Sequence, residues 1–532
     1  MKSLPNNPNI DHLKRQAKAL LANLRSGSPE AVQRFQASLP AAAGKDAERL
    51  AGLRLHDAQS CIAREYGFVS WADLSTFVDK ARARLSDEVT VAAKFAHLAY
   101  AGGIAEGLDK PQPTQAAQIL SLLKEFGPLD PWVACAAGEA TIVQEAIDRD
   151  TTWISRSGGP LDLPPLVAAA HTSLVRLPEH RSGIHATVRL LLDAGADPNQ
   201  SVLGRWPPEV DGSPSQHRLS ALYGAAGVNH DPLLTRMLLD AGADPNDNES
   251  LYHSIEAGDP ELVQLLLNAG AIVQGTNALY HALDYDDLDT FILLLTRTKT
   301  VDEPSMGPLL HWAIKRRRSV GHVQAILDAG GATEGASALA HRCGLVDVAA
   351  LLGSTAQELQ GDADRFVAAC ARADGDEARR LKERHPRFPA ALDEPQLKIL
   401  PELAASGCHD AVTLMVELGW PLDIRGGDWS ASALNQAVFR GDARLASTLL
   451  EHGSTWTEEH GFGDNACGTL SWASINRPEP DGDWVGCARA LVANGMPAAT
   501  RDPTNPEIVL VGGERRQFSE EVTQYLLSVG FT

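Results

Sequence analysis

The sequence predicts an all-α protein, built as a solenoid of stacked helix-turn-helix units and preceded by a small helical domain. Two observations support this fold class. The phrase LLLDAGADPN at 190–199 returns almost unchanged as MLLDAGADPN at 237–246, and both phrases end an apolar stretch of helical spacing. The chain has 532 residues, more than a single hydrophobic core of about 250–300 residues holds, which favours a repeated architecture.

Residues 1–85 are expected to form an amino-terminal helical domain. The letters SPE at 28–30 predict a helix N-cap followed by proline in the first turn. The segment 56–78 predicts a helix that breaks at Gly67 and then restarts. The first unit of an array would otherwise expose its apolar face to water. The domain is therefore expected to cap it.

Residues 88–532 are expected to form the array, with about thirteen helix pairs. In each pair a short helix rich in small residues precedes a leucine-rich helix that stops at a glycine, where a left-handed C-cap residue is needed. The glycine stops after the two strongest copies are Gly270, Gly330, Gly419, Gly453, Gly495 and Gly530. Weaker pairs are expected at 95–127 and 364–386.

Two insertions interrupt the predicted array, at 201–220 and 455–487. Insertions in a solenoid form loops on one face, so both are expected to lie beside the helices as loops. The second one holds HGFGDN at 460–465, which we interpret as a structured turn in preference to a metal or phosphate loop.

The helix-turn-helix unit that begins like TPLHxAA and ends like LLxxGAdpN resembles the ankyrin repeat. The resemblance extends over about residues 88–532 and is strongest at 190–199 and 237–246. The segment AREYGFVSWADL within 56–78 resembles a small helical module that precedes ankyrin arrays in many bacterial proteins. The family resemblance implies protein partners. The family's histidine, which ties adjacent turns, is replaced here by Tyr223, Tyr252 and Tyr280.

Charge limits the classes of partner. The chain has 47 basic and 68 acidic residues, a net charge of −21 with histidine neutral. Such a surface repels phosphate backbones and anionic lipids, so neither nucleic acid nor a membrane is expected as a partner. Seven widely spaced cysteines, without a CxxC pair, predict buried thiols in a reducing compartment. A cytoplasmic protein is expected, because neither a leader nor an apolar membrane segment is recognisable. It is also expected to be a monomer.

Histidines recur at one place in the first helix of several units. They are His97, His253, His281, His311 and His341. Equivalent positions in neighbouring units are about 10 Å apart, too far for two imidazoles to share one zinc ion, so no metal is expected. One interpretation makes these rings interior residues bonded to turn carbonyls. The other places them in a ligand-binding groove between about residues 206 and 315, with the 201–220 insertion above it.

The candidate partner- or ligand-binding residues of this groove are aromatic or basic. They are Trp206, His217, Tyr223, Tyr252, His253, Tyr280, His281, Tyr285, His311, Trp312 and Lys315. No catalytic residue and no cofactor are assigned, because the sequence lacks the recognisable catalytic and phosphate-loop motifs. The basic run at 315–318 is expected to be a solvated helix end, with an acidic partner as the alternative.

Four tryptophans, Trp429, Trp456, Trp472 and Trp484, gather around the second insertion. They either fix that segment onto the array or present anchors to a partner, and the sequence does not separate the two roles.

The function predicted from these observations is a protein-binding scaffold that uses the concave groove of the array. The alternative is a small-molecule binder or a hydrolytic, acid–base enzyme with the histidine- and tyrosine-lined groove as its site. A third hypothesis is a structural spacer, or an immunity-type protein whose acidic surface neutralises a basic partner.

Overall fold

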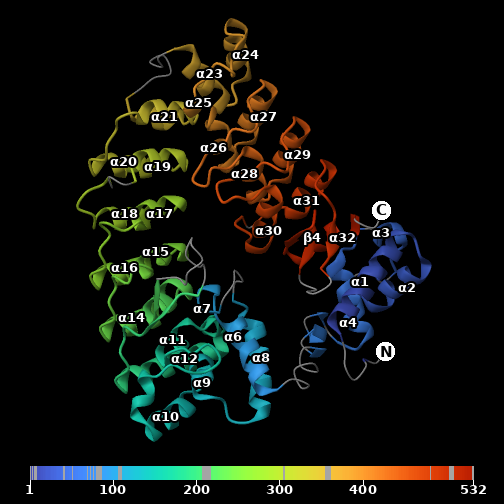
Figure 1. Ribbon diagram of the computed structural model, residues 1–532, viewed down its shortest axis with the longest axis vertical. Coiled ribbons are helices and arrows are strands. Elements are labelled where there is room, and N and C mark those ends of the chain that lie inside the picture. The colour runs from blue at the N-terminus through green and yellow to red at the C-terminus, as the bar shows by residue number, and fades with distance from the viewer. Residues whose placement is uncertain are drawn as a thin grey trace. The chain divides into compact units, whose positions relative to one another are not determined.

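The computed structural model consists mainly of short helices (Figure 1). It describes residues 2, 4, 9–39, 42, 44–50, 52–68, 70–71, 73–75, 77–78, 87–105, 111–205, 217–302, 306–353, 361–479, 481–502 and 508–529. The predicted fold class, an all-α array of helix pairs preceded by a small helical domain, is confirmed. Two compact units divide the chain, Met1–Ser254 and Ile255–Thr532, and each is described by itself.

The first unit begins with a helical module that has its own apolar core. Its helices are α1 (Ile10–Arg25), α2 (Pro29–Ser38), α3 (Ala47–Leu50) and α4 (Leu55–Glu65). Ser28 caps α2 through a hydrogen bond from the Ala31 amide to its hydroxyl, as the sequence predicts. Phe35 and Ile62 are fully buried in this core. Its role as a cap of the array stays a prediction.

The rest of the first unit consists of helix pairs. The helices are α6 (Glu88–Ala99), α7 (Gly102–Ala105), α8 (Pro113–Phe126), α9 (Pro131–Ala137), α10 (Ala140–Arg149), α11 (Pro165–His171), α12 (Pro178–Asp193), α13 (Ala221–Tyr223), α14 (Pro232–Asp240) and α15 (Ser250–Ser254). Three short helical segments join them, η2 (Thr151–Ser155), η3 (Ser173–Arg176) and η4 (Gly224–Val228). The helix α6 packs against α8, which confirms the weak pair expected at 95–127.

The insertion at 201–220 contains a short antiparallel hairpin. Its strands are β1 (Ser201–Leu203) and β2 (Arg218–Ser220), with Val202 opposite Leu219. The hairpin leads into α13, whose N-cap is Ser220. It therefore brings the start of one helix pair beside the turn that ends the pair before it.

The second unit continues with helix pairs, and Figure 1 shows α17–α18 and α19–α20 as successive layers. Its first helices are η5 (Ile255–Ala257), α16 (Pro260–Asn268), α17 (Ala278–His281), η6 (Ala282–Asp284), α18 (Leu288–Leu295), α19 (Leu309–Lys315), α20 (Val320–Asp328), α21 (Ala336–Arg342) and α22 (Val346–Leu351). The later helices are α23 (Asp362–Ala371), α24 (Gly375–Arg384), α25 (Glu394–Leu397), α26 (Ile399–Ala405), α27 (His409–Glu417), α28 (Ala433–Arg440), α29 (Ala443–Glu451), α30 (Ala466–Asn476), α31 (Trp484–Ala493) and α32 (Glu520–Val529).

The glycine stops have the backbone conformation that the sequence predicts. Seven of them lie in the left-handed region, with φ between 84° and 108°, a conformation that a residue with a Cβ adopts only under strain. They are Gly195, Gly242, Gly270, Gly330, Gly419, Gly453 and Gly495. Gly530 lies outside the described residues. The leucine-rich helices thus end in the same way along both units.

Two segments differ from the expectations. The insertion at 455–487, expected as a loop, contains α30, which packs between α28 and α31 as the first helix of a further pair. A three-stranded antiparallel sheet, β3 (Ala499–Arg501), β4 (Val509–Val511) and β5 (Glu514–Arg516), lies between α31 and α32. The last helix pair was expected to begin with a helix, but the chain forms these three strands there instead.

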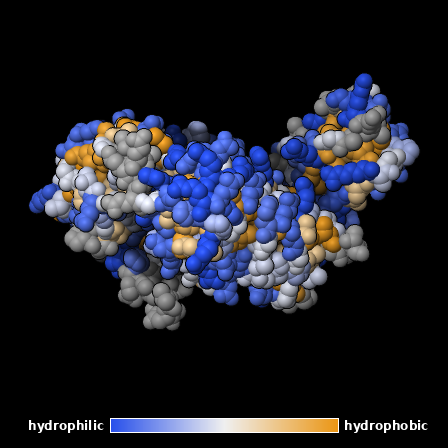
Figure 2. Space-filling model, turned by 90° about the horizontal axis from the view of Figure 1, so that it is seen from above, coloured by the Kyte–Doolittle hydropathy of each residue, from blue (hydrophilic) through white to orange (hydrophobic). Residues whose placement is uncertain are grey.

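No helix in the described ranges has the length and apolar character needed to cross a membrane. The face drawn in Figure 2 is mostly hydrophilic, with smaller apolar areas, in keeping with the net charge of −21.

Candidate functional site

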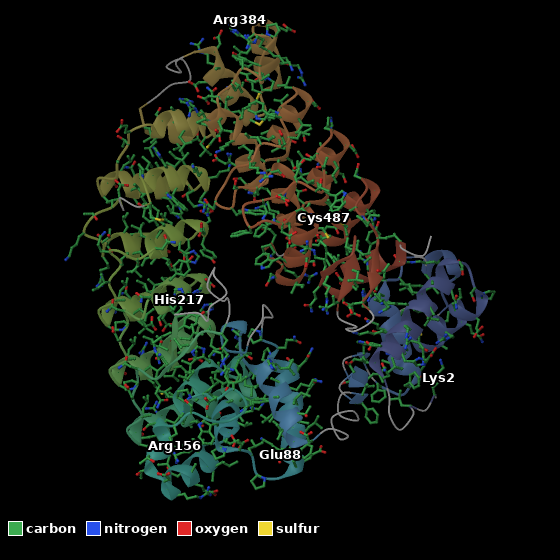
Figure 3. All side chains as sticks on the ribbon, in the orientation of Figure 1. Lys2, Glu88, Arg156, His217, Arg384 and Cys487 are labelled. Atoms are coloured by element: carbon green, nitrogen blue, oxygen red, sulfur yellow. The ribbon has the colours of Figure 1, made fainter. Side chains whose placement is uncertain are left out.

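In the first unit, two histidines of the predicted groove lie close to one carboxylate. Glu249 Oε1 lies 3.6 Å from Nδ1 of His217, a residue labelled in Figure 3, and Glu249 Oε2 lies 3.4 Å from His253 Nε2. The ring of His253 packs between Tyr223 and Tyr252, with centroids 5.3 and 4.9 Å away. The hydrogen bond with His253 outweighs burial and lowers the pKa of Glu249 below its ordinary value.

A polar cavity of about 370 Å³ opens beside this carboxylate. We call it the polar cavity, and its lining is Pro198, Asn199, Ser201, His217, Arg218, Ser220, Leu222, Asp244, Asp247, Asn248 and Glu249. Asp247 stabilises the fold, because it accepts hydrogen bonds from the hydroxyls of Ser220 and Ser250. Trp206, predicted to cover this region, lies outside the described residues.

In the second unit, Tyr280 and His281 are buried. The Tyr280 hydroxyl donates to the Gly307 carbonyl at 2.7 Å, and its ring meets Trp312 edge to face at 5.6 Å. His281 Nδ1 donates to Asp284 at 2.9 Å. Burial disfavours the charged imidazole, but Asp284 and Glu256 outweigh it and raise the pKa of His281 above its ordinary value. Tyr285, against the His281 ring, is exposed.

His311, Trp312 and Lys315 lie on α19 and all contact the chain itself. His311 Nε2 donates to the Glu334 carbonyl at 2.8 Å, and Trp312 Nε1 donates to the Met306 carbonyl at 2.9 Å. Lys315 Nζ lies 3.8 Å from Glu402 Oε1. The ligand-contact role of these residues stays a prediction, while their described partners belong to the fold.

Arg316 shows that the basic run at 315–318 is engaged in contacts within the chain. Its Nε lies 2.7 Å from Asp284 and its Nη2 lies 2.5 Å from Asp428. The guanidinium also lies over the Trp312 ring at 4.8 Å. The expectation of a solvated helix end is therefore wrong for Arg316, because carboxylates distant in the sequence pair with it.

Side chains of the first helices repeatedly bond the turn of the next pair. We call these bonds the turn ties, and each joins a side chain to a main-chain carbonyl: His171 to Ser220 at 2.7 Å, Tyr280 to Gly307 at 2.7 Å, His311 to Glu334 at 2.8 Å and Asn435 to Glu458 at 3.0 Å. His311 makes the bond to a turn carbonyl that the interior interpretation predicts, although its ring is only half-buried. Tyr280 shows that a phenol can replace an imidazole in this role.

A different group of aromatic side chains includes two rings that are open to solvent. They line a cavity of about 680 Å³ in the second unit. We call it the aromatic cavity, and its lining is Asp428, Trp429, Phe439, His460, Phe462, Asp464, Gly468, Thr469 and Trp472. Phe462 is 80% exposed and Trp472 is 41% exposed, whereas most large apolar side chains of the described residues are buried. Exposed aromatic groups of this kind mark interaction sites.

The five rings of the aromatic cavity form a continuous series. Centroid distances are 6.0 Å from Phe462 to His460, 5.0 Å from His460 to Trp429 and 5.7 Å from Trp429 to Phe439. Phe439 then stacks on Trp472 at 5.4 Å and an interplanar angle of 9°. The helices α28 and α30 carry Phe439 and Trp472, which form one end of the series, while the loops before these helices carry Trp429, His460 and the exposed ring of Phe462.

Ion pairs hold the loops of the aromatic cavity. Arg516, at the end of β5, pairs with both oxygens of Asp464, at 2.5 and 2.7 Å. Asp428 bonds Arg316, as above. Burial, with Arg425 acting in the same direction, lowers the pKa of His460 despite the nearby Asp464. This lowered pKa favours the uncharged imidazole of His460.

The sequence named two of these rings without choosing their role. Trp484 fixes the chain onto the array, since it is buried and its Nε1 donates to the Phe439 carbonyl at 3.4 Å. Trp429 and Trp472 line the cavity instead. Phe439 was missed because it follows the repeat pattern of α28. The glycine-rich turn HGFGDN, interpreted correctly as a turn, was the available signal for His460 and Phe462.

Metal and thiol chemistry find little support in the described part of the chain. It holds no group of three or more histidine, cysteine or carboxylate residues placed to bind a metal. The seven cysteines are free thiols, and six are buried, among them Cys487 on α31 (Figure 3). Burial raises the pKa of every one of them, which makes the thiolate scarce at neutral pH.

No protein-family model matches the chain, and no curated protein matches it. Among solved structures, it is similar to the crystal structure of the human ASB11 ankyrin repeat domain, with 18% sequence identity and a TM-score of 0.29. The match covers 39% of this chain and 86% of that domain. A likeness this slight carries no functional argument.

Proposed function

We propose that this chain is a protein-binding scaffold of the ankyrin type. The support comes from its construction: short helix pairs end at equivalent glycines, and turn ties join one pair to the next. Binding to a surface that is already ordered costs less conformational entropy, which favours affinity. The sequence resemblance to ankyrin repeats points to the same class of function.

The aromatic cavity is the observation that carries this proposal. Phe462 and Trp472 expose large apolar area, although burying such a ring within the chain would stabilise it by about 1.5–3 kcal/mol. Tryptophan and other aromatic residues dominate the energetics of protein interfaces. A partner that covers these rings would gain this free energy on binding. The predicted residues of the groove, such as Tyr252 and His281, stay part of the proposal as further contacts.

Affinity capture from the native host, with quantitative mass spectrometry, tests this function. The bait is the full chain, compared with a Phe462→Ala, Trp472→Ala variant. A Phe126→Ala variant is the matched control, because Phe126 is 44% exposed on α8, outside the aromatic cavity. We expect one protein enriched by the wild type and the control but lost from the double variant.

The captured protein must then bind the purified chain with the same dependence on the two rings. If no protein is enriched, the scaffold function is wrong. If a purified partner binds the double variant as tightly as the wild type, the scaffold function stands and the aromatic cavity is not its site. A double variant Tyr252→Ala, His281→Ala that keeps full affinity would remove the predicted groove from the proposal.

A small-molecule site at the polar cavity is the second candidate. Its support is the pair of imidazoles on either side of Glu249, beside a cavity of about 370 Å³. A thermal-shift screen of metabolites tests it, because a ligand that binds only the folded state raises the melting temperature. The response should disappear in Glu249→Gln. A screen without any shift contradicts this candidate.

Three further properties belong to the proposal. A monomer in the cytoplasm is proposed, in line with seven free thiols. Nucleic acid is not proposed as a partner, because the net charge of −21 opposes binding to phosphate. A basic protein is the kind of partner that this negative charge attracts most strongly.

A further inference from the structure

As far as the structure describes the chain, the lining of the aromatic cavity contains two carboxylates, Asp428 and Asp464, and no lysine or arginine. Arg516 engages both oxygens of Asp464, so that carboxylate is largely satisfied. The Asp428 side chain is 60% exposed, and Arg316 contacts its Oδ2. Asp428 therefore adds an exposed carboxylate, paired through Oδ2 with Arg316, to a lining that is mostly aromatic.

The five rings favour the same sign of charge. The face of an aromatic ring carries a negative quadrupole, which attracts cations within about 6 Å of the centroid, and tryptophan is the strongest of the three aromatic side chains. Two tryptophans, Trp429 and Trp472, lie in the series of rings with Phe439 between them, and burial lowers the pKa of His460, which favours the uncharged imidazole. Rings and carboxylate together fit a cation with a broad apolar surface.

A guanidinium group fits such a site better than an ammonium group does. It is planar, weakly hydrated and able to stack on a ring while it bonds a carboxylate edge-on. The chain already contains this arrangement: Arg316 lies over Trp312 at 4.8 Å and pairs with Asp284 and Asp428. Asp428 is thus one carboxylate beside two aromatic surfaces, and among the described residues an arginine lies over the Trp312 surface but not over the cavity rings.

Resting on the proposed scaffold function, we propose that the aromatic cavity binds an arginine side chain from a basic segment of the protein partner. The guanidinium stacks on the cavity rings, and Asp428 accepts a hydrogen bond from it. The net charge of −21 attracts a basic segment over longer distances, so its association is faster at low ionic strength.

Peptide titration of the full chain tests this site without an identified partner. The probe is a glycine-serine peptide with one central arginine. Comparison peptides carry citrulline, leucine, lysine or trimethyllysine at that position. Binding is followed by tryptophan fluorescence and by isothermal titration calorimetry. We expect the arginine peptide to bind about tenfold more tightly than the citrulline peptide, which has the same shape without the charge.

Variants locate the binding. Trp472→Ala and Asp428→Asn should each weaken the arginine peptide severalfold, while Phe126→Ala and Glu521→Gln should leave its affinity unchanged. Glu521 is the matched carboxylate, exposed at the start of α32. Circular dichroism of each variant confirms that it is folded.

Four results would overturn the inference. Equal binding of citrulline or leucine would make the cavity an apolar site, and tighter binding of lysine or trimethyllysine would replace the guanidinium by an ammonium group. Unchanged affinity in both cavity variants would place the arginine elsewhere. No binding of any peptide up to millimolar concentration would reject a cation site. None of these four results decides the scaffold function, which the capture experiment tests independently.

Discussion

The turn ties and the aromatic cavity use similar side chains in opposite ways. Tyr280 is 1% exposed, and its hydroxyl bonds the Gly307 carbonyl of the next turn. Phe462 is 80% exposed, in a turn between two helix pairs. Tyr280, at a position whose turn tie recurs in several helix pairs, thus stabilises the stack, whereas Phe462, in a turn outside the repeated helices, is available to a partner.

This difference gives a rule for interpreting such a chain. Recurrence at a fixed place reports packing, because each unit must solve the same problem of joining its neighbour. A residue that lies outside the repeated positions, such as Phe462, indicates a local requirement other than the packing of one helix pair on the next. The predictions below test the rule, from the largest expected effect to the smallest.

Replacing Tyr280 by alanine should produce the largest loss of stability. It removes a fully buried ring and one turn tie, so we expect the free energy of unfolding to fall by about 3–5 kcal/mol. Native-state hydrogen exchange of the amides in α17–α20 measures it, since it reports local opening of a long array. Phe462→Ala, the matched exposed ring, should change stability by less than about 0.5 kcal/mol. Equal losses in the two variants would break the comparison.

The turn tie of His171 should make stability depend on pH. Burial, only partly opposed by the bond to Ser220, lowers the pKa of His171 to about 4. The unfolded chain, with an ordinary pKa of about 6.5, binds the proton first as pH falls, so stability present above pH 6.5 is lost towards pH 4, by about 3 kcal/mol. Urea denaturation of wild type and His171→Gln at several pH values measures it.

His281 should show the opposite dependence. Its pKa is raised, so its contribution is full below the unfolded pKa and is lost as pH rises through the folded pKa. Comparison with His281→Gln isolates this contribution. If both histidine variants shift the stability profile in the same direction, the assignment of their environments is wrong.

Two glycines separate backbone conformation from close packing. Gly441 and Gly453 both have positive φ, at 70° and 108°. A Cβ on Gly441 would lie 2.6 Å from Gly482 Cα, whereas one on Gly453 would have no atom within 4 Å. We therefore expect Gly441→Ala to cost about 2 kcal/mol more than Gly453→Ala in urea denaturation. Equal costs would show that Gly482 yields without strain.

Replacing Tyr280 by phenylalanine should have a much smaller effect than replacing it by alanine. It keeps the buried ring and removes only the hydroxyl that bonds Gly307, so we expect a loss of about 1 kcal/mol. The same hydrogen-exchange measurement applies. A loss as large as that of Tyr280→Ala would mean that the hydroxyl, and not the ring, holds the two turns together.

Local signals in the sequence predicted most of the helix ends. Ser28 before Pro29, and the glycine stops such as Gly242, act within one turn of the chain, so they are legible without the fold. The helix α30 was not recognisable, because its buried residues surround the helix and leave no apolar face. The strands β3–β5, three residues each, are too short for an alternating pattern to stand out.

The candidate site was predictable only in part. Trp429 and Trp472 were named from composition, but their role depends on which neighbours cover them. Asp428 meets Arg316 across 112 residues of sequence, a contact that no local pattern encodes. The predicted histidines lie on the first helices of their pairs, as expected. Their regular recurrence, which made them candidates, reflects their position in the stack of helix pairs.

The common geometry of the glycine stops has a consequence for how such a chain changes length. Seven glycines end their helices with φ between 84° and 108°, so each of these helix pairs ends with the same local backbone conformation. Gene duplication or deletion of a whole helix pair would then leave the remaining helix pairs undisturbed. The near-identical phrases at 190–199 and 237–246 are what a recent copying event of this kind would leave behind.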